Sequence, residues 1–316
     1  ETALLAACKN QFGKSENIRV NIDRETGEVK VFADYEVVED DMIEDDALQI
    51  GITEAKLRFR DDVEVGEKVS TEVTPKNFGR IAAQKAKQVV VQKIREEERK
   101  VLYVQYLEKE REVITGIVQR YSGKNVCINL GRVDAILMES EQVRGEHFRP
   151  TEHIKLYVVE VKDTPKGPRI TVSRSHPEFV KRLFEEEVTE IQDGIVTIES
   201  IAREAGSRTK IAVSTVDPNV DAVGACVGMN GSRVNAIVNE LRGEKIDIVN
   251  WSDMPEIFIE NALSPAVVMD VSIDEYEKTA RVIVPENQLS LAIGKEGQNA
   301  RLAAKLTGYK IDIKCE

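Results

Sequence analysis

The chain has 316 residues, of which 41% are hydrophobic and 32% are charged, a composition typical of a folded protein with two or more cores. No apolar run approaches the roughly 18 residues that a membrane span needs, and the start lacks the profile of a secretory signal. We therefore expect a cytoplasmic protein without membrane contact. The cysteines form no Cys-x-x-Cys pair, which favours reduced thiols over disulfides or zinc; they are Cys8, Cys127, Cys226 and Cys315.

The net charge of −12 argues, taken alone, against nucleic-acid binding, because affinity for phosphate comes mainly from Lys and Arg. The charge is unevenly distributed, however. Residues 111–175 hold 11 basic against 8 acidic side chains, whereas residues 176–316 hold 15 against 24. Acidic residues crowd Glu36–Asp46, while residues 73–95 contain six basic side chains and no acidic one. This contrast indicates either two oppositely charged surfaces or an ordinary solvated helix face.

The first part of the chain reads as a helix followed by a hairpin. The helix covers Glu1–Phe12, and because it begins without an initiator Met, we expect an N-terminal piece to be missing. Asn17–Asp23 and Glu28–Ala33 then alternate apolar and polar residues around the turn-forming sequence Arg24–Gly27. This alternation predicts a β-hairpin.

A long helix is predicted after Pro75, from Arg80 to about Glu108, in a segment rich in Ala, Gln, Lys and Val. A strand pattern begins soon after its charged end, so we place the first domain boundary near residue 110. Apolar residues recur along the helix on one stripe at helical spacing, namely Ala83, Ala86, Val90, Ile94 and Val101.

A run of short strands follows the long helix. Turn-forming residues such as Ser122–Lys124 and Thr164–Pro168 separate the runs. About five strands in so short a segment favour a small barrel of the OB type, a fold that commonly binds single strands. The predicted strands are Val113–Arg120, Asn125–Leu130, Val133–Met138, Ile154–Val161 and Ile170–Ser173.

The remainder of the chain repeats itself. Gly228–Gly231 is followed by helix-forming residues, by a closing glycine, and by the strand-like Lys245–Ile248. The same order returns from Gly294–Gly297 to Lys310–Ile313, at an offset of 66 residues for the loops and 65 for the strands. Each copy therefore predicts a short helix, a Gly-x-x-Gly turn, a second helix closed by glycine, and a strand.

The repeated turn suits the backbone of a nucleic acid. Glycine at both ends allows a sugar-phosphate chain to approach, because no Cβ stands in the way. The second helix adds unpaired N–H groups and the positive end of its dipole. This is the chemistry of a KH module, in which the loop grips about four nucleotides and the bases lie in an adjacent groove. One such turn is a weak signal, but two copies in one register are hard to explain as packing alone.

The predicted RNA-binding residues are those of each loop and the polar side chains that follow it. The apolar positions of the helix after the first loop have instead the spacing of a core stripe. In the first module the candidates are Gly228, Met229, Asn230, Gly231, Ser232, Arg233 and Asn235, and in the second they are Gly294, Lys295, Glu296, Gly297, Gln298, Asn299 and Arg301.

No set of residues for catalysis is recognisable. Gly294-Lys295 fails as a phosphate loop, because the residue five before Gly294 is Leu289 and Lys295 is followed by Glu296. The acidic run Asp40–Asp46 is compatible with magnesium binding, although an acidic surface loop is commoner. We therefore expect no catalytic residue, no metal, no cofactor and no enzymatic activity.

The order of parts, together with several long stretches, resembles the NusA family of bacterial transcription termination/antitermination factors over the whole chain. It implies a multidomain α+β fold with an N-terminal RNA polymerase-binding domain in residues 1–110. An OB-type barrel, like those repeated in the largest small-subunit ribosomal protein, follows in residues 111–175, and two tandem type II KH domains follow in residues 176–250 and 251–316. The stretches are Arg24–Gly27, Thr74–Gln84, Ala205–Ile211, Val238–Val249, Gln288–Lys295 and Gly297–Gly308.

The resemblance also implies partners. The N-terminal domain is expected to dock on RNA polymerase, and the barrel and both KH domains are expected to receive single-stranded nascent RNA. This implies control of pausing, termination and antitermination in company with other elongation factors, by a protein that we expect to be a monomer. By the same resemblance, the candidates for polymerase contact are Lys76, Arg80, Lys85 and Lys87.

The chain departs from related proteins in two places. Many related barrels carry aromatic side chains where this one has Lys124 and Cys127, so we expect the barrel to act more by charge than by base stacking. The first KH loop has no cation between its glycines, so its grip on phosphate is expected to depend on Arg233. The barrel candidates for RNA contact are Arg120, Tyr121, Lys124, Phe148 and Arg169.

Two other functions stay open from the sequence. One is the RNA-capture subunit of a ribonuclease assembly, because such assemblies also use OB and KH modules. The other is a hydrolase that uses the acidic run Asp40–Asp46.

Overall fold

The computed structural model describes residues 17–23, 26, 29–74 and 78–315. The predicted helix Glu1–Phe12, Cys8 and Lys76 lie outside these residues. The chain divides into two compact units, Glu1–Arg99 and Lys100–Glu316. The boundary between the units falls about ten residues before the expected one, and the four domain boundaries stay predictions.

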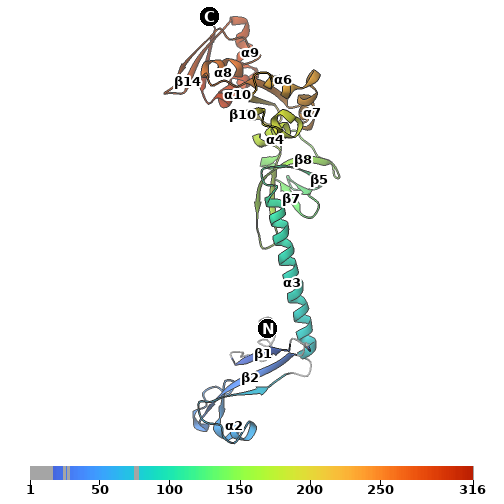
Figure 1. Cartoon of the computed structure of the whole chain (residues 1–316), viewed down its shortest axis with the longest axis vertical. Helices are drawn as coiled ribbons and strands as arrows, with labels where there is room; N and C mark the ends of the chain where they lie inside the picture. Colours follow the sequence, from blue (N-terminus) through green and yellow to red (C-terminus); the bar gives the residue numbers. More distant parts are fainter. Residues whose placement is uncertain (1–16, 24–25, 27–28, 75–77, 316) are drawn as a thin grey trace. The chain divides into compact units, whose positions relative to one another are not determined.

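The first unit contains a four-stranded sheet in the order β1-β2-β3, with β4 paired to β2 (Figure 1). β1 and β2 are antiparallel, with Ile18 opposite Ala33, so the predicted hairpin is confirmed. Helix α2 packs on the far end of β2, where Ala55 joins Val37 in a small core. The elements are β1 (Ile18–Ile22), β2 (Val29–Val38), a 3-10 turn (Asp40–Met42), β3 (Gln49–Gly51), α2 (Ile52–Arg58) and β4 (Lys68–Glu72).

The predicted long helix is confirmed as α3 (Phe78–Leu107), which continues across the boundary between the two units. Its expected apolar stripe is present but exposed: Val90 is 56% and Val101 61% accessible. The last turn of α3 belongs to the second unit. There Tyr106 is buried in the core of the barrel, and its hydroxyl donates to the carbonyl of Leu130 at 2.8 Å.

The predicted five-stranded barrel is present and closed, in the order β5-β6-β7-β9-β8. Gly116 on β5 faces the crowded barrel interior, since a Cβ there would come within 2.3 Å of Ile128. The five strands lie within about two residues of their predicted bounds. They are β5 (Val113–Ser122), β6 (Asn125–Asn129), β7 (Asp134–Leu137), β8 (His153–Lys162) and β9 (Arg169–Ser173), with a 3-10 turn at Glu139–Glu141.

Two modules of similar topology follow the barrel, which confirms the expected type II KH folds. In each, a hairpin of two antiparallel strands precedes the predicted helix, turn, helix and strand, and the last strand pairs in parallel with the middle one. The first module has α4 (Pro177–Glu187), α5 (Thr189–Gln192), β10 (Val196–Glu204), β11 (Arg208–Thr215), α6 (Ala222–Val227), α7 (Ser232–Glu240) and β12 (Lys245–Asn250). The second has α8 (Pro255–Ala262), β13 (Asp270–Asp274), β14 (Thr279–Val284), α9 (Leu289–Ile293), α10 (Gln298–Thr307) and β15 (Lys310–Cys315).

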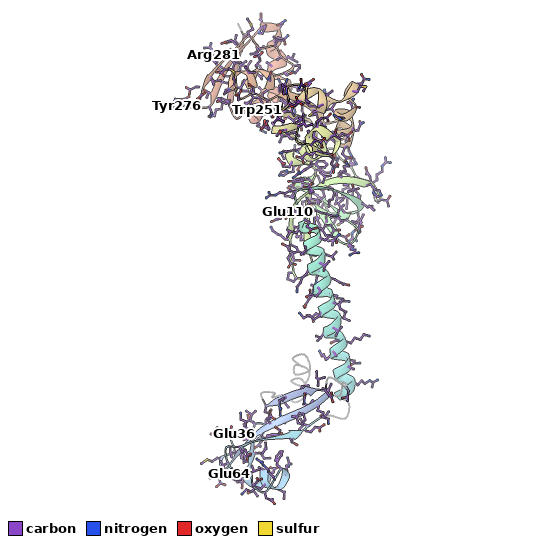
Figure 2. The ribbon with its side chains drawn as sticks, viewed as in Figure 1. Glu36, Glu64, Glu110, Trp251, Tyr276 and Arg281 are labelled. Carbon is purple, nitrogen blue, oxygen red and sulfur yellow. The ribbon has the colours of Figure 1, made fainter. Side chains whose placement is uncertain are left out.

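The two KH modules share one hydrophobic core. Ala202, Ala212 and Val249, on the sheet of the first module, are buried in the same cluster as Ile259 and Leu302 of the second. The other face of that sheet packs against the helices of the first module. The first KH sheet is therefore covered on both faces, and the modules are joined by packing as well as by the short linker that contains Trp251 (Figure 2).

Buried ion pairs hold the first KH module together and join it to the barrel. Arg174, 1% exposed, donates to both carboxylate oxygens of Glu146 in the barrel and to the carbonyl of Glu240 on α7. Within the module, Arg203 makes a two-pronged contact of 2.9 Å and 2.9 Å with Glu244. That carboxylate also accepts from the backbone N–H of Gly206 at 2.7 Å.

No helix in the part of the chain that the structure describes combines the length and apolar character needed to cross a membrane.

The buried pair Arg203–Glu244 predicts a large loss of stability when one partner is removed. Arg203→Ala leaves the Glu244 carboxylate buried without its cation, which is expected to cost about 3–5 kcal/mol. Lys314→Ala, at an ion pair whose partners are 51% and 66% exposed, should cost less than about 0.5 kcal/mol. Urea titrations followed by the fluorescence of Trp251, the single tryptophan, measure both. Equal midpoints for the two variants would contradict the expectation.

Candidate nucleic-acid interface

The two Gly-x-x-Gly loops form corners of nearly the same backbone shape. The first glycine has φ 77 and ψ 170 in Gly228, and φ 74 and ψ 173 in Gly294. The third residue is left-handed in both corners, with φ 54 at Asn230 and at Glu296. In each corner the N–H of the last glycine donates to the carbonyl of the first at 3.1 Å. The repeat seen in the sequence therefore produces one geometry twice.

Each corner needs glycine at its first position for two reasons. The combination of positive φ with ψ near 170 is essentially restricted to glycine. A side chain would also collide with the start of the next helix, because a Cβ at Gly294 would lie 2.8 Å from the Cβ of Asn299, and one at Gly228 would lie 2.8 Å from Cγ of Arg233. The first glycine thus allows the second helix to begin directly against the corner.

Arg233 and Asn299 occupy the same position in the repeat, and the side chain of each donates hydrogen bonds to backbone carbonyls beside its own corner. Arg233 donates to the carbonyl of Ala225 at 2.7 Å and forms an ion pair with Glu190 at 2.8 Å. Asn299 is 3% exposed and donates to the carbonyls of Leu263 and Ala292, both at 3.0 Å. The prediction that Asn299 contacts RNA is therefore corrected, since its side chain is buried. Arg233 is half-buried and already paired.

Two of the candidates that follow the second loop bind the first KH module. Gln298 donates to Glu204 at 2.8 Å and to the hydroxyl of Ser207 at 2.7 Å. Arg301 donates to Glu204 at 2.9 Å, and this contact lowers the pKa of the Glu204 carboxyl. The remaining candidates of the two loops lie on the surface, and Met229 is 84% exposed. The exposed polar candidates are Asn230, Ser232, Asn235, Lys295 and Glu296.

On the barrel, strand register brings two predicted cations onto one outer surface. Arg120 lies opposite Cys127, which lies opposite Ile136, which in turn lies opposite Thr171. Arg169 is two residues from Thr171, and residues two apart on a strand point to the same side. Ile136, in the middle of this row, is 40% exposed. The same face also carries acidic side chains, because Glu160 lies opposite Thr171 and the exposed Asp134 lies two residues from Ile136. The expected weakness of base stacking stays a prediction.

The other barrel candidates are placed differently. Phe148 is buried, and the guanidinium of Arg242 lies 4.8 Å from its ring centre. It cannot stack on a base, and the prediction of RNA contact by Phe148 is corrected. Tyr121 is 44% exposed, and its hydroxyl accepts from the backbone N–H of Phe148 at 3.0 Å. Lys124 is exposed and paired with Glu139 at 2.8 Å.

Three of the four expected polymerase contacts lie on α3. Arg80, Lys85 and Lys87 are exposed, and Arg80 and Lys87, seven residues apart, share one side of the helix. In the acidic run, Asp40 accepts a hydrogen bond from the backbone N–H of Thr53 at 3.2 Å. Within the described ranges no group of three His, Cys, Asp or Glu side chains is close enough to hold a metal ion.

Family models match the N-terminal part of the chain and both KH modules on either side of the barrel. Models of the NusA N-terminal domain, the NusA-like first KH domain and the NusA-like second KH domain match residues 1–100, 174–251 and 255–316. These features define a multidomain protein of the tandem-KH class.

Relatives named transcription termination/antitermination protein NusA match the chain over its whole length. The protein of Bacillus subtilis is 56% identical over 316 residues, which are 100% of this chain and 84% of that protein. The protein of Thermus thermophilus is 43% identical over 95% of this chain and 77% of its own. The solution structure of the B. subtilis N-terminal domain is 50% identical over 31% of this chain and 77% of that chain, with a TM-score of 0.28. The chain belongs to the NusA family, and its role is that of a transcription factor.

The two glycines of the second corner are predicted to differ in their tolerance of a side chain. Gly294→Ala is expected to cost about 3 kcal/mol or more, because it combines a backbone conformation closed to alanine with a collision at Asn299. Gly297→Ala should cost about 1–2 kcal/mol, since left-handed backbone is only mildly unfavourable and the nearest atom is 3.5 Å away. Urea midpoints compare the two; a Gly297 variant as unstable as the Gly294 variant would contradict this order.

The thiol of Cys226, at the end of α6, is predicted to be inert. Burial raises its pKa to about 11, so at pH 8 only about one molecule in a thousand carries the thiolate that reacts. Iodoacetamide followed by mass spectrometry should modify the exposed Cys315 in native protein, and Cys226 only after unfolding in urea. Modification of both thiols at the same rate in native protein would show that the first corner opens readily.

Proposed function

We propose that the chain is a transcription elongation factor that binds RNA polymerase and the nascent RNA and modulates pausing, termination and antitermination. The observation that carries the proposal is the pair of matching glycine corners, held in one block by the shared core of the two KH modules. Both corners leave their middle residues exposed to a strand, and each is followed by the start of a helix whose dipole favours phosphate.

The barrel supports the same proposal with a separate surface. Arg120 and Arg169 place two cations on the face that carries Cys127, Ile136 and Thr171, and contacts from these cations to phosphate would not select a base sequence. In the first unit, the exposed cations Arg80, Lys85 and Lys87 of α3 are proposed to contact the polymerase or the RNA that leaves it. The excess of acidic over basic side chains in residues 176–316, 24 against 15, predicts modest RNA affinity for each KH module. Contacts from Lys and Arg to phosphate predict that binding falls steeply as salt rises.

The role in transcription is tested on purified elongation complexes. Saturating protein should change the lifetime of polymerase pauses, and the N-terminal unit should be required for that effect. The ribonuclease-subunit alternative expects instead that the protein copurifies with a nuclease and leaves pausing unchanged. Unchanged pause lifetimes at saturation would overturn the proposal.

The contribution of each corner is tested by adding charge within it. Replacing Lys295 and Glu296 by two aspartates, or Met229 and Asn230 by two aspartates, should weaken RNA binding at least about tenfold, since each change repels phosphate. Aspartate tolerates the left-handed backbone of the third position, so circular dichroism should be unchanged. Lys314→Asp changes the net charge by the same two units on β15 and is expected to leave affinity nearly unaltered. If both corner variants bind like the wild type, the corners are not RNA clamps.

A further inference from the structure

Three pockets on the KH modules differ in charge. One of about 540 Å³ is lined by Asp221 and Glu260, and another of about 420 Å³ by Asp221 and Asp253; neither has a basic residue in its lining. The third, of about 400 Å³, is lined by three basic residues and no acidic one, in a segment where acidic side chains outnumber basic ones by 24 to 15. Only this third pocket, of the three, suits an anion.

The basic pocket is built by both KH modules. The second module contributes the corner itself, through Gly294 and Lys295, and the start of α10. The first module contributes the opposite wall, through Ser207 and Arg208 at the β10–β11 turn and Lys245 at the start of β12. The backbone N–H of Lys245 donates to the carbonyl of Ser207 at 3.1 Å, which fixes the lysine beside the turn.

Two of the three cations are available for a ligand. Arg208 is committed, because it contacts Asp247 at 2.6 Å and 2.8 Å through two nitrogens. Lys245 and Lys295 are exposed, and neither has an ion-pair partner among the residues that the structure describes. They approach the pocket from different modules, so an anion between them would be contacted from both sides.

The relative position of the two walls is fixed by contacts outside the pocket. Glu204, near the end of β10, accepts from Gln298 and Arg301 on α10. The buried Lys210 on β11 donates to the carbonyl of Ser264 in the second module at 2.8 Å. Because these contacts hold the β10–β11 hairpin against α10, the wall from the first module is preformed.

We propose that this pocket binds one phosphate of the RNA strand between Lys245 and Lys295, so that the phosphate site of the second KH corner is completed by the first KH module. The inference rests on the proposed RNA-binding function. It adds that Lys245, which lies on a strand and outside both glycine loops, is an RNA-binding residue. The ligand class is a phosphodiester within a strand, held beside the corner that Gly294 and Lys295 contribute to the pocket.

The repeat supplies a matched control. Lys310 occupies the position of Lys245 in the second module: it is exposed, it begins the last strand, and its backbone N–H donates to the carbonyl of Lys278 at 2.8 Å. It does not line the basic pocket. Lys245→Ala and Lys310→Ala therefore remove the same charge from equivalent strands, and of the two lysines only Lys245 lines the pocket.

The test measures binding of an unstructured RNA of roughly 12 nucleotides, long enough for two clamps of four, by fluorescence anisotropy over a series of salt concentrations. Lys245→Ala should weaken binding about fivefold at low salt and reduce the slope of log affinity against log salt by about one. Lys295→Ala should behave in the same way. Lys310→Ala should bind like the wild type.

The outcomes separate this inference from the proposed function. Absence of RNA binding by the wild-type chain would overturn both. Wild-type binding that Lys295→Ala weakens and Lys245→Ala does not would overturn only the composite pocket, as would equal losses in the Lys245 and Lys310 variants. Titration with adenosine monophosphate alone should show no saturable binding; saturable binding that Lys245→Ala abolishes would assign the pocket to a free nucleotide instead of a strand.

Discussion

Burial of the first KH sheet beneath the second KH module is the constraint on which the rest of this region depends. Ala202, Ala212 and Val249 leave space for the helices of the second module to approach, and the shared core fixes the distance between the two glycine corners. If the modules were joined only by a flexible linker, that distance would vary. If the corners bind RNA as proposed, this fixed distance presents a strand held at one corner to the other at a high effective concentration.

Charge is arranged in this acidic protein so that many cations of the core and interfaces are neutralised and a few on the surface are not. Arg174, Arg203 and Arg208 each pair with a carboxylate and hold elements or modules together. Lys245 and Lys295, by contrast, line the basic pocket between the two KH modules. The net charge of −12 therefore gives little information about where phosphate can bind, because most of the relevant field is local.

Local signals in the sequence were sufficient for the barrel strands, the long helix and the helix, turn, helix and strand order of each KH module. They were insufficient for the two antiparallel strands that precede these elements in each module, β10 and β11 in the first and β13 and β14 in the second. β11 is buried on both faces from Thr209 to Val213, so it lacks the alternation by which a strand with one solvated face is recognised. The apolar stripe on α3 was predicted from its helical spacing, but that spacing does not show whether the stripe is buried against another element, and here it is exposed.

The two glycine turns were predicted from the sequence, whereas the contacts of the side chains around them were not. The glycine corners follow from the repeated sequence, because only glycine permits that backbone. The roles of Asn299, Phe148 and Gln298 depend on which tertiary neighbour each meets, and residue type and spacing do not specify that neighbour. Lys245 was visible as a member of the repeat, but its place beside the second corner follows only from how the modules pack.

The parallel pairing of the last strand in each module bears on how the chain is made. β11 can complete its parallel pairing only after β12, more than thirty residues further along the chain, has been synthesised. The face of β11 toward the second module is covered only by helices of that module, which are synthesised later. During synthesis from the amino end, the sheet of the first module is consequently left with an apolar surface open to water until the second has emerged from the ribosome. Because the two modules share one core, the stability of the first module depends on the presence of the second.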